Sequence, residues 1–472
     1  MRTALLIDFG STETKVTAVD LDNEEILGTA QSYTTVASDI NDGLEIALKK
    51  LSEKTGLTEY DETYACSSAA GGLRMIASGL VMELTAEAAK AAALGAGAKV
   101  LKTYAFNLND ADVEEIKEIS PDIMLLVGGT DGGNRECILN NAKAVAGIDI
   151  PFPVIVAGNR DVAKQCADIL SATHPCHICE NVMPKLGKLN IEPTRKKIRE
   201  VFLEKIVSAK GLSKANELIS GIINPTPAAV MNSIKLLAEG YEDEPGIGEL
   251  LAIDIGGATT DIYTICAGNP TKANTVFRGI PEPYEKRSVE ADIGMRYCVN
   301  GIAEANGLWK VAKMAGMSEE KVREMLDYLS THTDSMPEQH EDSFDWFKLD
   351  YVLASLAVET AVDRHAGYVE ENYSMMGVCY TQYGKDLSNV HNIVVTGGIL
   401  IHNYRHAQIA SHALYDREHP MSLRPTSAKV FLDAKYIIAS MGLLSEYHPK
   451  VALHLLKKEL VCTGEFHSID RK

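Results

Sequence analysis

One pattern of residues occurs twice in this chain, and the two copies lie more than two hundred residues apart. Residues 5–19 and 251–263 each begin with an apolar run, pass through Asp-x-Gly and a hydroxyl-rich turn, and return to an apolar run. This order predicts a strand, a tight turn and a second strand at both places. We therefore expect a duplicated domain in a chain of 472 residues, a length for which about three domains is the usual prior.

The turn of each copy has the chemistry of an anion cradle. Glycine lets the chain turn with positive φ and exposes backbone N–H groups, which in a tight turn bind anionic oxygens. Hydroxyl side chains beside the glycines add further donors. The expected phosphate-binding residues are Gly10, Ser11, Thr12, Gly256, Gly257, Ala258, Thr259 and Thr260.

Charged residues flank both turns. Asp8 and Asp254 end the first apolar run of each copy, and Asp261 follows the second turn. Because carboxylates repel phosphate, these three aspartates predict a divalent cation, and Mg²⁺ is typically held by one or two carboxylates plus phosphate oxygens. Lys15 is placed to reach the terminal phosphates. We take these four residues as the candidate catalytic residues and the three aspartates as the candidate metal ligands.

The pattern differs from the better-known phosphate loops. Walker and dinucleotide loops run from a strand into a helix, whereas here an apolar strand-like run resumes after each turn. The string Gly-x-x-x-x-Gly-Lys-Ser/Thr does not occur in the chain. A lone Asp-x-Gly at a strand end is usually only a turn, but two copies together with the glycine pair Gly397 and Gly398 favour a nucleotide site.

Composition narrows the classes of partner and the compartment. The formal net charge is −19, which repels nucleic acid and anionic membrane surfaces. We find no signal-peptide pattern and no apolar run of membrane-spanning length. The Cys count of 9 is odd and the cysteines are scattered, which suggests reduced thiols. The expected location is cytoplasmic.

Changes in the pattern of strands, helices and turn residues suggest where domains begin and end. From about residue 60, short apolar strands alternate with helices, which predicts a parallel sheet covered on both faces. Residues 242–246 are an acidic, turn-rich joint. We predict a first half formed by 1–59 and 171–245, an inserted Rossmann-like or flavodoxin-like domain at 60–170, and a second half at 246–472. Within the second half we expect helix over 288–317 and a polar tail beyond residue 444.

Four stretches resemble motifs of the superfamily that contains actin, the sugar kinases and the seventy-kilodalton heat-shock chaperones. Residues 8–15 resemble its first phosphate loop, 254–261 its second, 394–398 its adenosine motif and 223–230 the chaperones' first connecting helix. The resemblance implies an α/β fold of two actin-like, ribonuclease H-like halves that close on Mg-ATP. One departure is that Asn224 directly precedes Pro225, where the chaperones carry an intervening Glu near the attacking water. The general base for hydrolysis is therefore unassigned.

Longer strings give a more specific resemblance, which runs nearly end to end. They lie at 67–75, 84–99, 127–134, 157–160 and 290–296, and they resemble the accessory protein encoded beside glutamate mutase (methylaspartate mutase). That family implies an ATPase that acts as a reactivating chaperone. It would bind the subunits of an adenosylcobalamin-dependent mutase and use ATP to exchange damaged cobalamin for intact coenzyme. The implied cofactors of this chain are ATP and Mg²⁺, with adenosylcobalamin on the partner, since the Asp-x-His-x-x-Gly signature is absent here.

Other readings remain open at this stage. The alternative functions are a small-molecule kinase of the same fold and a scaffold that uses ATP structurally. A homo-oligomer is an open alternative for the assembly. The loop at 128–133 could bind an anion at a helix N-terminus, although a structural turn is favoured. Residues 174–179 carry four candidate metal ligands without the second pair that a zinc site usually has. His402 and His406 are read as loop and surface histidines.

Overall fold

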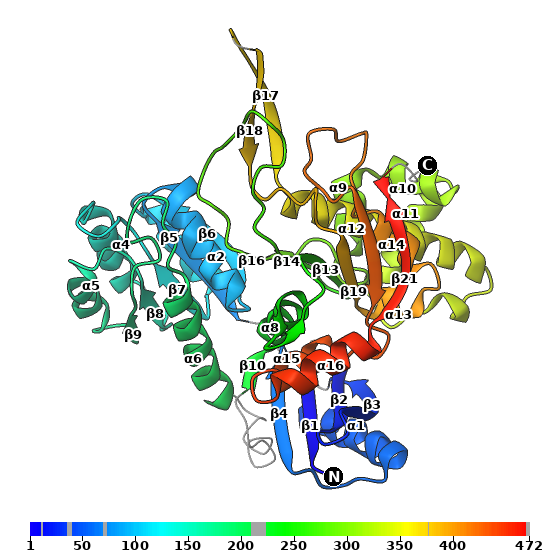
Figure 1. Cartoon of the computed structure of the whole chain (residues 1–472). Helices are drawn as coiled ribbons and strands as arrows, with labels where there is room; N and C mark the ends of the chain where they lie inside the picture. Colours follow the sequence, from blue (N-terminus) through cyan, green and yellow to red (C-terminus); the bar gives the residue numbers. More distant parts are fainter. Residues whose placement is uncertain (11–12, 35–39, 69–72, 209–222, 376, 469–472) are drawn as a thin grey trace. The chain divides into compact units, whose positions relative to one another are not determined.

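The computed structural model describes residues 1–10, 13–34, 40–68, 73–208, 223–375 and 377–468. The chain divides into two compact units. Figure 1 shows its helices and strands, coloured along the sequence. Unit 1 comprises Met1–Ser233, Gly279–Pro283 and Ala439–Leu455, and unit 2 comprises Ile234–Arg278, Tyr284–Ile438 and Leu456–Lys472. Both contain helices and sheets, so the fold is mixed α/β. None of the described helices combines the length and the hydropathy needed to cross a membrane.

The N-terminal repeat forms the centre of the first sheet of unit 1. Its strands are β1 (Thr3–Phe9), β2 (Glu13–Asp20), β3 (Glu25–Tyr33), β4 (Glu62–Ser67) and β10 (Ile223–Pro225), in the order β10-β4-β1-β2-β3. The pairs β1–β2 and β2–β3 are antiparallel, whereas β4 runs parallel to β1 and to β10. Helix α1 (Ile40–Thr55) packs on this sheet, because Leu44, Ala47 and Leu51 are buried with Ile7 and Phe9.

The strand at 63–67 was expected in the inserted domain, and that placement is wrong. The strand β4 pairs with β1 from Ala4↔Glu62 to Phe9↔Ser67. Its residues Ala65 and Cys66 are fully buried, as befits a strand covered on both faces. Sequence alternation alone cannot assign a strand to one of two neighbouring sheets.

A second sheet of unit 1 is wholly parallel. Its strands are β5 (Arg74–Gly79), β6 (Lys99–Ala105), β7 (Ile123–Leu126), β8 (Val154–Val156) and β9 (Cys176–Ile178). The order is β6-β5-β7-β8-β9. Counted along the chain from β5 this is 2-1-3-4-5, an order found in doubly wound folds.

Helices cover this parallel sheet through two separate apolar clusters. One cluster joins α2 (Glu87–Gly95) and α6 (Glu192–Ser208) to Met75 and Leu125. The other brings α3 (Asp110–Ile119), α4 (Glu136–Ala146) and α5 (Ala163–Leu170) against Ile76 and Met124. The π-helical turn η2 (Met82–Ala86) leads into α2.

Residues after 170 were expected in the first actin-like half, and up to residue 208 the structure places them with the parallel sheet. The strand β9 pairs with β8, and Ile198, Val201 and Phe202 of α6 are buried in the cluster of Met75. The sequence of a helix with mixed charges does not indicate against which of two apolar cores its buried side chains pack. The sequence also indicates a helix at 213–219, and this range lies outside the described residues.

The second repeat forms the centre of the main sheet of unit 2. Its strands are β13 (Leu250–Ile255), β14 (Thr260–Ile265), β16 (Glu285–Glu290), β19 (Asn392–Thr396), β20 (Ser427–Leu432) and β21 (Val461–His467). The order is β16-β14-β13-β19-β20-β21. Strands β16, β14 and β13 are antiparallel neighbours, and β19 and β20 continue the sheet in parallel. The first sheet shows the same sequence of pairings, which confirms the internal duplication.

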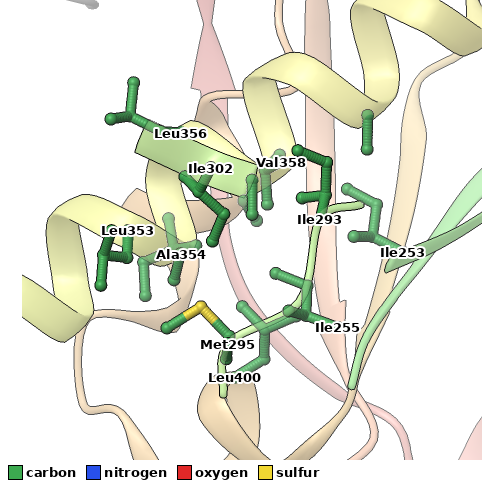
Figure 2. Packing of buried hydrophobic residues seen from close by; sticks show 14 of the residues in the cluster. Ile253, Ile255, Ile293, Met295, Ile302, Leu353, Ala354, Leu356, Val358 and Leu400 are labelled. Atoms are coloured by element: carbon green, nitrogen blue, oxygen red, sulfur yellow. The ribbon is translucent and has the colours of Figure 1, made fainter. Parts of the chain in front are cut away.

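A long central helix supports this sheet. Helix α12 (Ser343–His365) contributes Leu353, Ala354 and Val358 to a cluster with Ile253 and Ile255 (Figure 2). Other helices pack beside it: α9 (Val299–Asn306), α10 (Leu308–Ala315), α11 (Glu319–Thr331), η3 (Pro337–Gln339), α13 (Gly398–His402) and α14 (His406–Ser411). The chain also contains α8 (Thr226–Glu239), the short strands β11 (Gly240–Tyr241) and β12 (Glu244–Pro245), α15 (Ile438–Leu444) and α16 (Pro449–Glu459).

Three parts of the predicted second half, 246–472, differ from the sequence expectation. Residues 288–317 were predicted as helix, but β16 occupies 285–290 and α9 begins at Val299. Gly307, with φ +84°, separates α9 from α10. The region beyond residue 444 was predicted as a polar tail, but it contains α16 and the edge strand β21. A hairpin of β17 (Tyr368–Ser374) and β18 (Gly377–Tyr383), paired to β15 (Thr275–Phe277), was not predicted.

Candidate functional site

The two repeats fold into hairpins with the same register. The Gly10 amide donates to the Glu13 carbonyl at 3.0 Å, and the Gly256 amide donates to the Thr259 carbonyl at 2.9 Å. Across the strands Asp8 pairs with Lys15, and Asp254 pairs with Asp261. Lys15 and Asp261 therefore occupy equivalent positions with opposite charge. Ser11 and Thr12 of the first turn lie outside the described residues.

Asp8 is a buried carboxylate, only 5% exposed, with two neutral donors. The Thr226 hydroxyl, at the start of α8, donates to Oδ1 at 2.6 Å, and the Cys66 thiol lies 3.4 Å from the same oxygen. Burial and the Asp8 charge raise the pKa of Cys66 well above its usual value, so this thiol stays protonated and can act as a donor. Neither Thr226 nor Cys66 was expected from the sequence.

Asp254 lies in a row of polar residues at the carboxyl ends of three strands. It pairs with Asp261 on one side and with Thr396 on the other. The Thr396 hydroxyl donates to Asp433 Oδ2 at 3.1 Å. The buried Asp433 also accepts the backbone amides of Ile437 and Ile438, at 2.9 and 3.1 Å. The carboxyl edge of an α/β sheet is where such folds bind ligands.

Asp261 forms a buried ion pair that the sequence did not reveal. Arg287, on β16, donates to Asp261 Oδ1 through Nε at 2.9 Å and through Nη2 at 2.6 Å. The side chains of Arg287 and Asp261 are only 5% and 13% exposed. Burial lowers the pKa of Arg287, but the Asp261 charge outweighs that effect and holds this pKa above its usual value. Asp261 Oδ2 accepts the Thr259 hydroxyl at 3.1 Å, which ties it to the second turn.

The segment after β16 holds the second turn in place. The backbone amides of Met295, Arg296 and Tyr297 donate to the carbonyls of Gly256 and Gly257 at 2.9–3.1 Å. The Thr260 hydroxyl donates to the Ile293 carbonyl at 3.0 Å. One of the long strings noted in the sequence, 290–296, therefore supports the turn that contains Gly256, Gly257, Ala258 and Thr259.

The glycine pair requires glycine at its first position. Gly397 has φ +101°, and a Cβ there would lie 2.3 Å from the Ile255 carbonyl oxygen. A Cβ at Gly398 would lie 3.0 Å from the Tyr436 hydroxyl. The pair therefore brings bare backbone close to the end of β13, where the second repeat turns.

Hydrogen bonds from buried side chains hold the loop at 128–133 in place. The Asn181 amide donates to the Gly129 carbonyl at 3.0 Å and to Asp131 Oδ1 at 2.9 Å. The Asn159 amide donates to the Gly133 carbonyl at 3.2 Å. Both asparagines are almost fully buried, so these contacts support the reading of a structural turn. In the 174–179 stretch, the ring of His174 lies tilted against that of Phe152, with centroids 4.5 Å apart, and is hydrogen-bonded to the Val145 carbonyl.

A family model described as MutL protein matches residues 4–460 of the chain. The protein named Protein MutL from Clostridium tetanomorphum is 46% identical over 460 residues, which covers 97% of this chain and 99% of that protein.

Solved structures give only a distant likeness. The activator of the 2-hydroxyisocaproyl-CoA dehydratase from Clostridium difficile with bound ADPNP matches with a TM-score of 0.33 and 11% identity, over 98% of this chain and 100% of that chain. Plasmodium falciparum glycerol kinase with ADP matches with a TM-score of 0.36 and 11% identity, over 99% and 94% of the two chains. Scores this low carry no functional argument.

Proposed function

The chain belongs to the MutL protein family, and from this premise we propose that it is an ATP-dependent reactivating chaperone for an adenosylcobalamin-dependent mutase. Its client is glutamate mutase, and its action is to promote exchange of damaged cobalamin for intact coenzyme. The adenosylcobalamin belongs to the mutase subunits, and ATP with Mg²⁺ belongs to this chain. The MutL family meant here is the one associated with glutamate mutase and not the DNA-repair protein of the same name. A net charge of −19 supports that distinction, because it opposes binding to DNA phosphates.

The single observation that carries the proposal is the matched pair of Asp-x-Gly hairpins. Each places an acidic side chain at the end of a central strand and closes its turn with a glycine amide. We propose that each turn binds phosphate oxygens of Mg-ATP, and that the backbone of Gly397 and Gly398 lies against the adenosine. Two hairpins with one register in sheets of the same pairing order support two actin-like halves. The 2-1-3-4-5 sheet supports a flavodoxin-like insert between them.

The carboxylates suit magnesium. Asp8 and Asp254 are oxygen donors at strand ends, and Mg²⁺ needs one or two such carboxylates plus phosphate oxygens. Asp261 already balances Arg287, so we assign it the role of fixing the turn. The bound ion would neutralise charge on the transferring phosphate. Lys15, opposite Asp8, would contact the terminal phosphates.

The site also indicates how ATP would be used. Asn224 and Pro225 stand where the chaperones carry the intervening glutamate, and Asn224 donates to Glu446 at 2.5 Å. With no acidic residue at that place, we expect slow turnover. ATP would then serve to switch the protein between states that bind the mutase differently, as in other nucleotide-driven hinge motions.

A reconstitution experiment tests the proposal. Mutase inactivated with cyanocobalamin is incubated with this protein, ATP, Mg²⁺ and free adenosylcobalamin, and mutase activity is followed. We expect recovery that requires all four components and that Asp254→Ala abolishes. Absence of recovery with the wild-type protein would overturn the chaperone role. Transfer of phosphate to a metabolite, instead of release to water, would establish the small-molecule kinase alternative.

A further inference from the structure

Unit 2 contains a group of side chains of the types that bind metals, and none of its members belongs to the two Asp-x-Gly turns. Glu359 of α12, and Asp416 and His419 of the loop that follows α14, each offer a ligand atom. These atoms all lie within 4.8 Å of one another. A further imidazole, that of His412 at the end of α14, places Nδ1 3.3 Å from Glu359 Oε2. We propose that Glu359, Asp416 and His419 bind a divalent transition-metal ion of the zinc class, and that His412 positions Glu359 through this contact.

The burial of Glu359 separates this group from an ordinary acidic surface. Glu359 is only 6% exposed, in a helix whose neighbouring residues Val358 and Ala361 belong to the core. Lys310 binds its Oε1 at 2.9 Å, which leaves Oε2 directed toward the imidazole of His412. Asp416 is half-buried and His419 is exposed, so the group extends from the helical core to the surface, where an ion from solvent has access to it.

The donor types decide the class of ion. Imidazole together with carboxylate suits zinc and its transition-metal neighbours, whereas magnesium and calcium prefer oxygen ligands alone. Two carboxylates and one imidazole provide three ligands, and a water molecule in the fourth position would complete the tetrahedral coordination of zinc. Thiolates do not take part, which distinguishes this site from adventitious binding to the free cysteines.

The position of the group suggests what the ion does. The loop that carries Asp416 and His419 continues to Met421 and Leu423, which bond to Val369 and Gly367 at the base of the β17–β18 hairpin. A metal shared between α12 and this loop would fix the loop to the helical core. We infer a structural role, in which the ion holds the base of the hairpin.

Direct metal binding tests the site on the full chain. Chelator-treated, reduced protein is titrated with zinc against a competing indicator, and with cobalt to obtain an absorption spectrum. We expect one tight site per chain whose cobalt spectrum lacks the charge-transfer band of thiolate ligands. His419→Ala and Glu359→Gln should each weaken zinc binding by more than about 100-fold, since loss of even an outer-shell partner costs about 10–100-fold. His402→Ala, an exposed histidine outside the group, is the matched control and should bind as the wild type.

A second readout does not depend on affinity. Arg417 is exposed between the two loop ligands, so zinc should slow tryptic cleavage there in the wild type and not in His419→Ala. The inference fails if the wild type binds no zinc, or if binding and protection survive both Glu359→Gln and His419→Ala. Asp254→Asn should leave zinc binding unchanged, so failure of this site and failure of the ATP proposal are distinguishable.

Discussion

Removing one partner of the buried ion pair of Asp261 and Arg287 should strongly destabilise unit 2. Both side chains are nearly buried, and Arg287 contacts one carboxylate oxygen with two nitrogens. The substitution Arg287→Met keeps an apolar chain but leaves Asp261 as an uncompensated charge. Breaking a buried pair in this way typically costs about 3–5 kcal/mol. In this variant Asp261 still accepts a hydrogen bond from the Thr259 hydroxyl. We therefore expect the free energy of unfolding to fall by about 3 kcal/mol, at the lower end of that range.

Tryptophan fluorescence reports on this unit selectively. Both tryptophans, Trp309 and Trp346, belong to unit 2, so a urea titration followed by their emission measures the unfolding of that unit. With a slope of about 1–3 kcal/mol/M, the loss moves the midpoint down by about 1–3 M. The double variant Arg287→Met with Asp261→Asn removes both charges and should recover much of this loss.

The comparison of single and double variants can refute the reasoning. If Arg287→Met costs less than about 1 kcal/mol, the pair is worth no more than an exposed one. If the double variant is as unstable as the sum of the single ones, the two residues do not interact energetically.

Three further outcomes follow from the contacts. Gly397→Ala should cost about 1–3 kcal/mol of backbone strain and abolish ATP binding measured by calorimetry, whereas Gly248→Ala, at φ +89° with no atom within 4 Å, should show strain alone. Thr226→Val should cost about 1.5–3 kcal/mol by removing the donor to Asp8, and Thr226→Ser should restore it; equal urea midpoints for both variants would contradict the assignment. Burial lowers the pKa of His365 well below 6.5, so this group stabilises the fold above pH 6.5, and stability should fall by up to about 1.4 kcal/mol per pH unit below that value. A His365→Gln variant with an unchanged pH slope would show that another group titrates.

The sequence predicted best what is local. Each hairpin was expected because a strand, a turn and a strand follow one another within one short stretch, and the alternation of strands and helices expected from about residue 60 includes β6. Residues 285–290 read Glu-Lys-Arg-Ser-Val-Glu and show no clear strand alternation. They form β16 because β14 offers an edge, which is a non-local cause. The edge strand β21 and the hairpin of β17 and β18 were missed for the same reason.

The partners of the candidate residues could not be predicted, because they come from distant parts of the chain. Thr226 reaches Asp8 across 218 residues of sequence, and Arg287 directly precedes the segment 288–317 that was predicted as helix. Such contacts depend on tertiary pairing, for which a single sequence carries no direct signal. The turn glycines were predictable because positive φ and close backbone approach restrict the residue type locally.

The divergence of the two hairpins separates the roles of the two aspartates in unit 2. In unit 1 the residue opposite Asp8 is the cation Lys15, whereas in unit 2 the residue opposite Asp254 is Asp261, already matched by Arg287. We therefore assign the cation to Asp254, which lies at the end of the central strand β13. We expect Asp254→Asn to weaken the magnesium dependence of ATP binding by at least about tenfold, which corresponds to about 1.4 kcal/mol. Asp261→Asn should chiefly lower the urea midpoint, because it removes the negative charge that Arg287 contacts. If Asp261→Asn alters the magnesium dependence more than Asp254→Asn does, Asp261 is the ligand and Arg287 must leave it when the nucleotide binds.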